Sequence, residues 1–301
     1  MKKFNFLIIV SLLSIYTIAQ TSKTYTKSIE DWHQKRIDNL KKPNGWLNLE
    51  GLFWLHEGNN SFGQAEGNDC KYQNPNAKTV FFPNHIGDFL LEGDSVVWVG
   101  AEQYAVTINK QLVEAGRKVL VFKESLPTIN TEWRQFSWTI IKREEKIGVR
   151  FRNIQSNNVL HFKGIERFPI DAAWRVKATL LPPTQDFLMI TNVLGQTTSS
   201  KNAGKLVFTI QGKAYSLDVL DEGGETLFIT FADETAGKTT YGAGRFIDIE
   251  RPDANGNTII DFNLAYNPPC AFTEFATCPL PPAQNRLKIP ITAGEKNYGH
   301  H

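Results

Sequence analysis

Apolar and polar residues alternate with a period of two along most of this 301-residue chain. The alternation is plainest over Trp174–Leu180, where apolar side chains interleave with arginine, lysine and threonine. Successive side chains of a strand point to opposite faces of a sheet, so this pattern predicts half-buried antiparallel strands. The same pattern predicts strands at Thr79–Phe82, Ser95–Val99, Tyr104–Ile108, Lys118–Phe122, Phe136–Lys142, Ile147–Phe151, Phe187–Val193, Leu206–Ile210, Ala214–Leu220, Thr226–Phe231, Arg245–Ile249 and Thr258–Phe262.

Short turns separate these runs. The segments Glu92–Asp94, Gln211–Lys213 and Asn255–Asn257 each contain a central glycine and are typical of hairpin tips. Strands at such short and regular spacing predict a sandwich or a barrel. We therefore expect a mainly β fold of antiparallel, sandwich-like or barrel-like sheets, in one or two tightly packed halves, with one N-terminal helix.

The helix is predicted over Ser28–Lys42. Ser28 and Asp31 have the spacing of an N-terminal capping arrangement, and Pro43 would end the helix. The helical spacing of four apolar residues predicts a stripe along one face, made of Ile29, Trp32, Ile37 and Leu40. We expect this stripe to pack on the domain that follows.

The N-terminus has the pattern of a secretory signal peptide. Lys2 and Lys3 precede an apolar run, Phe6–Ile18, and small residues follow near Ala19. We therefore expect cleavage after residues 1–19 and a periplasmic or secreted location. The mature chain has no second apolar stretch of the roughly 20 residues that a spanning helix needs, so no membrane insertion is predicted.

Four segments follow from these patterns: the signal peptide at 1–19, an N-terminal segment with the helix at 20–45, a first β half at 46–160 and a second at 161–301. A polar stretch, Asn153–Asn158, lies near the boundary between the halves. The stretch is short and is followed by apolar residues, which favours two packed halves over two domains on a flexible linker.

The charge of the chain argues against a nucleic-acid partner. The sequence has 33 basic and 31 acidic side chains, and loss of residues 1–19 would remove two lysines and no acid, which leaves a formal charge of zero. A neutral chain without a basic run lacks the electrostatic footprint that binding to nucleic acid needs.

The segment Asp261–Tyr298, called the proline/cysteine segment, contains two of the three cysteines. Cys270 and Cys278 enclose seven residues, and in an oxidising compartment such a pair most simply forms a disulfide. A redox or nucleophilic role is the alternative, although the spacing is not Cys-x-x-Cys. Cys70 is left over and is interpreted as a buried or idle thiol.

Polar residues gather around this segment in the sequence. Arginine can clamp a carboxylate or phosphate, and tyrosine, asparagine and acids can orient a small polar ligand. The candidate ligand-binding residues are Asp233, Tyr241, Arg245, Asp261, Asn263, Tyr266, Arg286 and Glu295. The alternative is structural: Arg245 would pair with Asp233 or Asp261 to satisfy buried charges.

No reaction is indicated by a motif. The histidines His33, His56, His85 and His161 lack the short spacings of zinc ligands, and no Gly-x-Ser-x-Gly occurs. Neither a metal ion nor a cofactor is predicted, and no catalytic residue is assigned.

Several motifs are similar to those of one family. They include Thr240–Phe246 (TYGAGRF), Asp261–Phe272 (DFNLAYNPPCAF) and Cys278–Pro282 (CPLPP). Shorter matches complete the set: Gly45–Leu47, Gly51–Leu55, Gly148–Arg150, Asn285–Leu287 and Ala293–Lys296. On these motifs the chain resembles the domain of unknown function 1684 family of bacterial and archaeal proteins. The resemblance implies no activity, substrate or catalytic residue.

Two functional hypotheses remain open. In the first, a pocket near the proline/cysteine segment binds or hydrolyses a small polar molecule. In the second, a non-enzymatic envelope protein docks a protein or glycan through exposed Tyr266, Phe272, Phe275 and Pro281. A purely structural role of the segment is the third interpretation, and whether the chain is an enzyme is left undecided.

Overall fold

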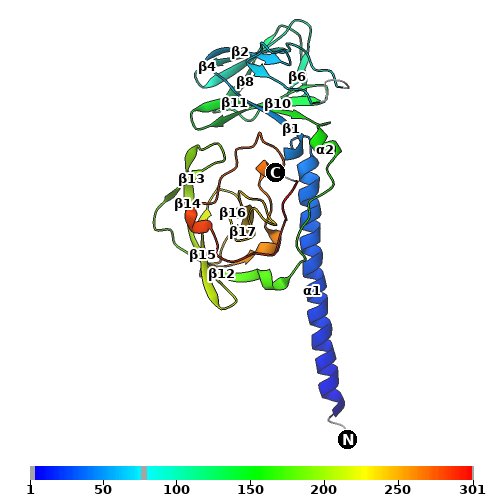
Figure 1. Cartoon of the computed structure of the whole chain (residues 1–301), viewed down its shortest axis with the longest axis vertical. Helices are drawn as coiled ribbons and strands as arrows, with labels where there is room; N and C mark the ends of the chain where they lie inside the picture. The colour runs from blue at the N-terminus through cyan, green and yellow to red at the C-terminus, as the bar shows by residue number, and fades with distance from the viewer. Residues whose placement is uncertain (1–3, 76–79, 300–301) are drawn as a thin grey trace. The chain divides into compact units, whose positions relative to one another are not determined.

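The chain divides into two compact units (Figure 1). The structure is a computed structural model. It describes the backbone of residues 4–75 and 80–299 and, within these ranges, the side chains from residue 23 onward. The sandwich unit comprises Asn39–Lys163 and Phe272–Ala276, and the barrel unit comprises Met1–Asp38, Gly164–Ala271 and Thr277–His301.

The sandwich unit contains two sheets within its described residues. Its strands are β1 (Leu49–Trp54), β2 (Gly58–Gly63), β3 (Cys70–Lys71), β4 (Gly87–Glu92), β5 (Ser95–Gly100), β6 (Val106–Ile108), β7 (Gln111–Val113), β8 (Lys118–Lys123), β9 (Asn130–Trp133), β10 (Phe136–Arg143) and β11 (Lys146–Asn153). One sheet has the order β1-β11-β10-β9-β6-β7 and the other β3-β2-β4-β5-β8. Two short helices, η1 (Trp46–Asn48) and α2 (Asn157–Leu160), flank the strands.

An aromatic core joins the two sheets. Phe62 of β2 is fully buried, and its ring centroid lies 5.5 Å from the rings of both Trp138 (β10) and Phe151 (β11) in the other sheet. Trp98 of β5 lies 5.1 Å from Trp138. Because rings of both sheets interdigitate, hydrophobic burial across the sandwich holds the sheets face to face.

The barrel unit is built on one strongly curved sheet. Its strands are β12 (Arg175–Leu181), β13 (Phe187–Thr191), β14 (Thr197–Ile210), β15 (Lys213–Leu220), β16 (Thr226–Phe231), β17 (Arg245–Glu250) and β18 (Asn257–Asp261). The order β17-β16-β15-β14-β12-β18 places two consecutive strands at opposite edges, while β13 pairs with the first part of β14. The turn that connects β17 to β18 brings these edges together, so the sheet is nearly closed into a barrel.

Alternate residues of these strands fill the barrel core. Examples are Leu206 and Phe208 of β14, Ile229 of β16 and Ile247 of β17, each under 5% exposed. The last part of the proline/cysteine segment, Leu287–Glu295, is called the C-terminal segment. Its apolar residues join the same core: Leu287, Ile289, Ile291 and Ala293. Short helices complete the unit: η2 (Ala172–Trp174), η3 (Phe262–Leu264), η4 (Pro269–Ala271) and η5 (Ala283–Asn285).

The predicted start of the N-terminal helix at Ser28 is wrong. Helix α1 runs without a break over Phe4–Lys41, so Ser28 is an interior residue, and its hydroxyl donates to the Tyr25 carbonyl at 2.7 Å. Such a bond to the preceding turn is what an interior helical serine makes in place of capping. The apolar face is present, since Ile29 and Leu40 are buried and Trp32 is half-buried.

The predicted mainly β fold with antiparallel sheets is confirmed, and Figure 1 shows the strands of both units. The strand predicted at Thr79–Phe82 is wrong for Val80–Phe82, and Thr79 lies outside the described residues. Phe82 is buried among aromatic rings, and Pro83, which has no N–H to donate, follows it. The apolar side chain of Phe82 therefore packs in the core although its backbone does not pair in a sheet. Strands β1 to β4, β7 and β9 had no prediction.

Residues 1–3 of the predicted signal peptide lie outside the described residues, and residues 4–19 are part of α1. None of the helices in the described part of the chain combines the length and apolarity needed to span a bilayer. Cleavage and secretion stay predictions.

Candidate functional site

Arg245 is a deeply buried charged residue of the predicted site. It begins β17 and its side chain is 1% exposed. Its Nη2 donates to Asp233 Oδ2 at 2.8 Å and to the Ile291 carbonyl at 3.0 Å, and its Nη1 donates to the carbonyls of Ala293 and Glu295. Burial lowers the pKa of Arg245, while the Asp233 carboxylate opposes this shift. The guanidinium thus joins the barrel sheet to three carbonyls of the C-terminal segment.

Asp233 has no oxygen free for a ligand. Its Oδ1 accepts from the Thr235 hydroxyl at 2.6 Å, the Thr235 N–H at 2.8 Å and the Ile291 N–H at 3.1 Å, while Oδ2 accepts from Arg245. Its side chain is also 1% exposed. A carboxylate with four donors is stabilised in place and is shielded from solvent.

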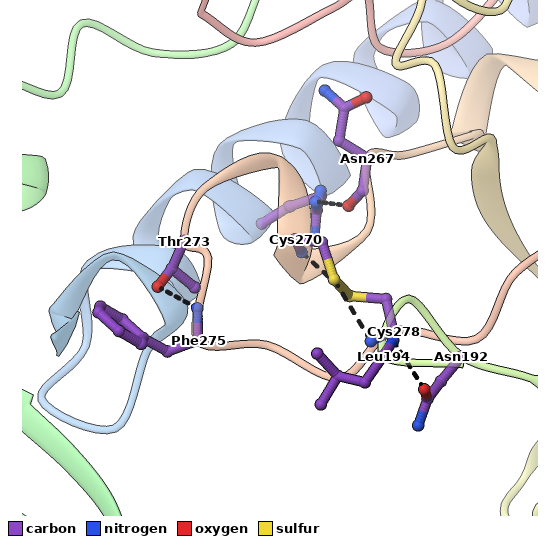
Figure 2. Close-up of a disulfide and its surroundings, with 8 residues drawn as sticks. Asn192, Leu194, Asn267, Cys270, Thr273, Phe275 and Cys278 are labelled. Carbon is purple, nitrogen blue, oxygen red and sulfur yellow. Dashed lines mark hydrogen bonds between the residues drawn. A yellow bond between two sulfur atoms is a disulfide. The ribbon is translucent and has the colours of Figure 1, made fainter. Parts of the chain in front are cut away.

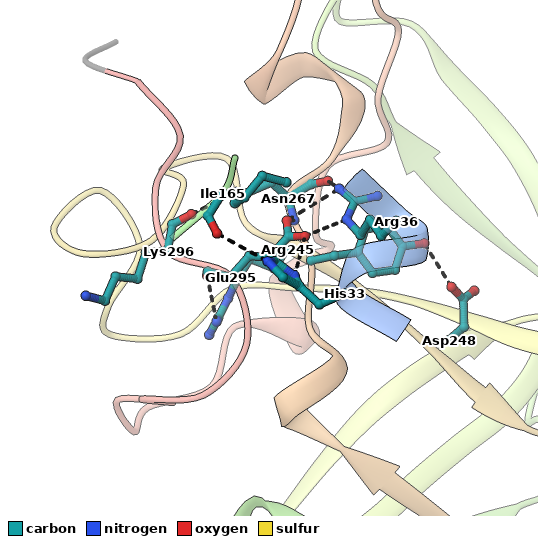
Figure 3. A network of polar contacts seen from close by, with 9 residues as sticks. His33, Arg36, Ile165, Arg245, Asp248, Asn267, Glu295 and Lys296 are labelled. Atoms are coloured by element: carbon teal, nitrogen blue, oxygen red, sulfur yellow. Dashed lines mark hydrogen bonds and ion pairs between the residues drawn. The ribbon is translucent and has the colours of Figure 1, made fainter. Parts of the chain in front are cut away.

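Glu295 forms a second buried network, shown in Figure 3. Its Oε1 accepts from Arg36 Nε of α1 at 2.6 Å, and its Oε2 accepts from the Asn267 N–H at 2.7 Å. Arg36 Nη2 also donates to the Asn267 carbonyl at 2.7 Å. His33, one helical turn before Arg36, places its Nε2 3.2 Å from the Ile165 carbonyl. These bonds fix the end of the proline/cysteine segment against α1.

Asp261 and Asn263 form a third network with Tyr25 of α1. Asp261 Oδ2 accepts from the Tyr25 hydroxyl at 2.8 Å, and its Oδ1 accepts from the N–H and side-chain amide of Asn263, both at 3.0 Å. Asn263 Oδ1 accepts from the Asp171 N–H at 3.0 Å. Burial, with the neighbouring Asp261 carboxylate, raises the pKa of Tyr25.

Of the other predicted residues, Tyr266 borders the Glu295 network, while Tyr241 and Arg286 form no part of the three networks. The Tyr266 hydroxyl donates to Asp248 at 2.9 Å, and the Arg36 guanidinium lies 4.5 Å from the Tyr266 ring centre. Tyr241 is half-buried, and Arg286 is exposed. The eight predicted residues therefore do not converge on one open cavity.

The proline/cysteine segment is closed by a disulfide between Cys270 and Cys278, whose Cα atoms are 6.1 Å apart (Figure 2). Between them, Thr273 Oγ1 donates to the Leu49 carbonyl of the sandwich unit, to which both residues belong. Cys70 is buried, and burial raises the pKa of its thiol to about 12. Cys70 is therefore an unreactive thiol in the folded protein.

The apolar patch that the docking hypothesis requires is not continuous. Phe272 is 4% exposed and Pro281 is buried, while Phe275 and Tyr266 are half-buried. Side chains that are already packed cannot bury further area on a partner.

An open pocket lies instead on the barrel sheet. Its volume is about 1280 Å³, and strands β12, β14, β17 and β18 supply most of its wall. Its charged lining residues are Arg175, Lys177, Asp248, Glu250, Arg251, Asp253 and Asp261. Its apolar lining residues are Val176, Ala178, Val207, Phe208, Ala214, Ile249, Ile259 and Leu264. Asp261 is the one predicted residue in this wall.

From the sequence, Arg175 and Lys177 were predicted only to be polar residues of a half-buried strand. The two residues are two apart on β12, and both are exposed. Two basic side chains on one face of a strand were the available signal for this pocket. No three His, Cys, Asp or Glu side chains of the described residues are grouped so that they could hold a metal ion.

Comparison with known families gives one match. The model of a family described as protein of unknown function (DUF1684) matches residues 160–296. Residues 160–296 of the chain belong to the DUF1684 family. The match covers the barrel strands and most of the proline/cysteine segment of this DUF1684 protein, while the motifs between Gly45 and Arg150 lie outside it.

One solved relative of this DUF1684 protein is an uncharacterized protein of Haloarcula marismortui, determined by solution NMR. The two sequences are 32% identical, the alignment covers 45% of this chain and 77% of the other, and the TM-score is 0.38. No curated protein matches the chain. The family model therefore assigns residues 160–296 to a family of unknown function, and it names no activity.

Replacement of Arg245 by Met should lower the free energy of unfolding by about 3–5 kcal/mol, because it leaves the Asp233 carboxylate buried and unpaired. The matched control is Arg251→Met, which breaks an ion pair with Asp221 whose arginine is 43% exposed and should cost no more than about 1 kcal/mol. Urea unfolding of both variants measures the difference. Equal losses would show that Arg245 does not anchor the fold.

His33 should make stability depend on pH. Burial lowers its pKa below the ordinary value of 6.5, although Glu295 opposes the shift. Below pH 6.5 the unfolded chain therefore takes up a proton that the folded chain resists, and the free energy of unfolding falls as the pH falls. His33→Gln should reduce the fall measured between about pH 7.5 and 5.5. The exposed control His161→Gln should keep the full fall; an unchanged slope in His33→Gln would refute the assignment.

Proposed function

We propose that the barrel unit binds a small amphipathic anion, a molecule with an apolar body and a carboxylate, phosphate or sulfonate group, in the pocket on β12, β14, β17 and β18. The observation that supports this most directly is the pair Arg175 and Lys177. Both cations line the pocket, and neither has an ion-pair partner among the described residues. Their donors are thus free for an anionic ligand group.

Most acids in the wall are already occupied. Asp261 accepts from Tyr25 and Asn263, as described above. Asp253 Oδ1 accepts from the N–H groups of Asn255 and Asn257 in the β17–β18 turn. Although acids outnumber bases in the lining, these internal bonds leave cationic donors as the main groups available to a ligand.

The remaining charged residues of the lining indicate which groups the ligand would carry. Arg251 is held by Asp221 at 2.6 Å, so Arg175 and Lys177 are the cations to consider. Glu250 is an exposed acid on β17, with no side-chain hydrogen bond in the described part of the molecule. A hydroxyl or amino group on the ligand would suit Glu250, and the apolar lining would contact the ligand body.

Binding is better supported than hydrolysis. The lining contains threonines but no histidine, cysteine, serine or tyrosine. A nucleophile with a neighbouring general base is the usual requirement for covalent hydrolysis, and this wall does not offer that pair. A ligand carrier or sensor fits the pocket more closely than a hydrolase does.

We also propose that the protein acts in the periplasm or outside the cell. The Cys270–Cys278 disulfide supports this location because such bonds persist in oxidising compartments. The predicted signal peptide supports it independently.

The fluorescent probe 8-anilinonaphthalene-1-sulfonate, an aromatic body with one sulfonate, tests the pocket. We expect saturable binding of one probe per chain, and we expect Lys177→Glu to weaken it about tenfold because the reversed charge repels the sulfonate. The matched control is Lys238→Glu, an exposed lysine of the same unit outside the pocket, which should bind as the wild type does.

A second variant tests the apolar wall. Ala214 is an exposed residue of the lining, and Ala214→Trp should fill part of the volume and weaken binding without loss of thermal stability. Probe binding that neither variant changes would place the probe elsewhere and would refute the proposed pocket.

A further inference from the structure

Two arginines of the sandwich unit are buried side by side without an acidic partner. Arg150 and Arg152 lie two residues apart on β11, so they share one face of the six-stranded sheet. Each is 9% exposed. Their neighbours Val149 and Phe151 point to the opposite face and belong to the aromatic core.

The residues paired with the two arginines across the sheet supply no counter-charge. Arg150 is paired across the sheet with Leu52 of β1 and Thr139 of β10. Arg152 is paired with Leu49 and Ser137. These positions are apolar or uncharged, and neither arginine forms an ion pair within the described residues.

Several guanidinium N–H groups also lack an acceptor. Nε and Nη2 of Arg150 and Nε of Arg152 are buried and have no hydrogen-bond partner in the described part of the chain. The contacts that do exist are weak: Arg150 lies 5.0 Å from the Trp46 ring centre, and Arg152 Nη1 donates to Thr139 Oγ1 at 3.4 Å. A buried donor without an acceptor is costly, and a charged donor more so.

Glu50, a nearby acid of β1, is already engaged. Its Oε2 accepts from the Tyr72 hydroxyl at 2.5 Å and from the Asn153 amide at 3.1 Å. Burial raises the pKa of Glu50, which these two hydrogen bonds oppose. Glu50 therefore serves its own network and does not neutralise the arginines.

Both arginines stay charged at neutral pH. Burial lowers the pKa of each to about 10, and the charge of Arg152 contributes to the shift of Arg150. Two adjacent buried cations repel each other and have lost most of their hydration. A bound anion would relieve both costs at once.

We infer that Arg150 and Arg152 form a binding site for an oxyanion with two negative charges, of which a phosphate group is the model. The paired guanidinium groups supply the unused N–H donors in the fork geometry that matches phosphate oxygens, and Trp46 lies against Arg150. The site shares no residue with the pocket of the barrel unit. It is therefore independent of the function proposed above.

Inorganic phosphate is the direct probe. Calorimetric titration of the full chain, at constant ionic strength maintained with sodium chloride, should show one site per chain for phosphate. Acetate, with a single charge, should bind at least tenfold more weakly. The thermal midpoint should rise saturably, by about 5 °C at a hundredfold excess of phosphate over its dissociation constant.

Phosphate also stabilises proteins without binding, because it is excluded from their surface. Variants of the two arginines distinguish this general effect from binding at the proposed site. The double variant Arg150→Met/Arg152→Met should lose the titration heat and the saturable rise, and keep only the gradual rise from exclusion. The matched control Lys118→Met removes an exposed lysine of β8, in the other sheet of the sandwich unit, and should keep the wild-type response.

Should the double variant fail to fold, Arg150→Lys keeps the charge but removes the fork, and should weaken phosphate binding about tenfold. Absence of saturable phosphate binding by the wild type would overturn the inference. Undiminished binding by a folded double variant would overturn it equally.

Discussion

The buried ion pair between Arg245 and Asp233 is the interaction on which the barrel unit depends. The C-terminal segment adds Leu287, Ile289 and Ile291 to the barrel core without forming a strand, so most of its backbone groups lack ladder partners. Arg245 supplies donors to three of its carbonyls, and Asp233 accepts an N–H from the same segment. Once the segment is fixed, Glu295 is in position to accept from Arg36 of α1.

This arrangement separates the buried polar residues from the residues of the proposed ligand pocket within the unit. The buried ion pairs Arg245–Asp233 and Arg36–Glu295 stabilise the barrel unit. The cations of the proposed ligand pocket, Arg175 and Lys177, lie on exposed strand positions. In the sandwich unit the buried arginines of β11 have no acidic partner among the described residues, and three of their N–H groups lack an acceptor.

Period-two alternation predicted the fold well, because burial of one sheet face acts locally on every second residue. The strand prediction was wrong at Val80–Phe82, where Phe82 is buried in the core but its backbone forms no strand. The predicted helix start at Ser28 was wrong because the helix already begins at Phe4. The site was harder to predict. Arg245 and Arg175 both lie in alternating runs, and only the fold shows that one meets carbonyls 46 to 50 residues away while the other faces an open pocket. Sequence spacing carries no information about such distant partners.

Hydrogen–deuterium exchange of the wild-type protein, with and without 8-anilinonaphthalene-1-sulfonate, tests most directly whether ligand binding and the buried polar motifs are separate. We expect slower exchange in peptides that cover β12 and β18, where the pocket wall lies, and unchanged exchange over Leu287–Glu295. Slower exchange over Leu287–Glu295, with β12 and β18 unchanged, would contradict this expectation, because the probe would then bind at the buried motifs.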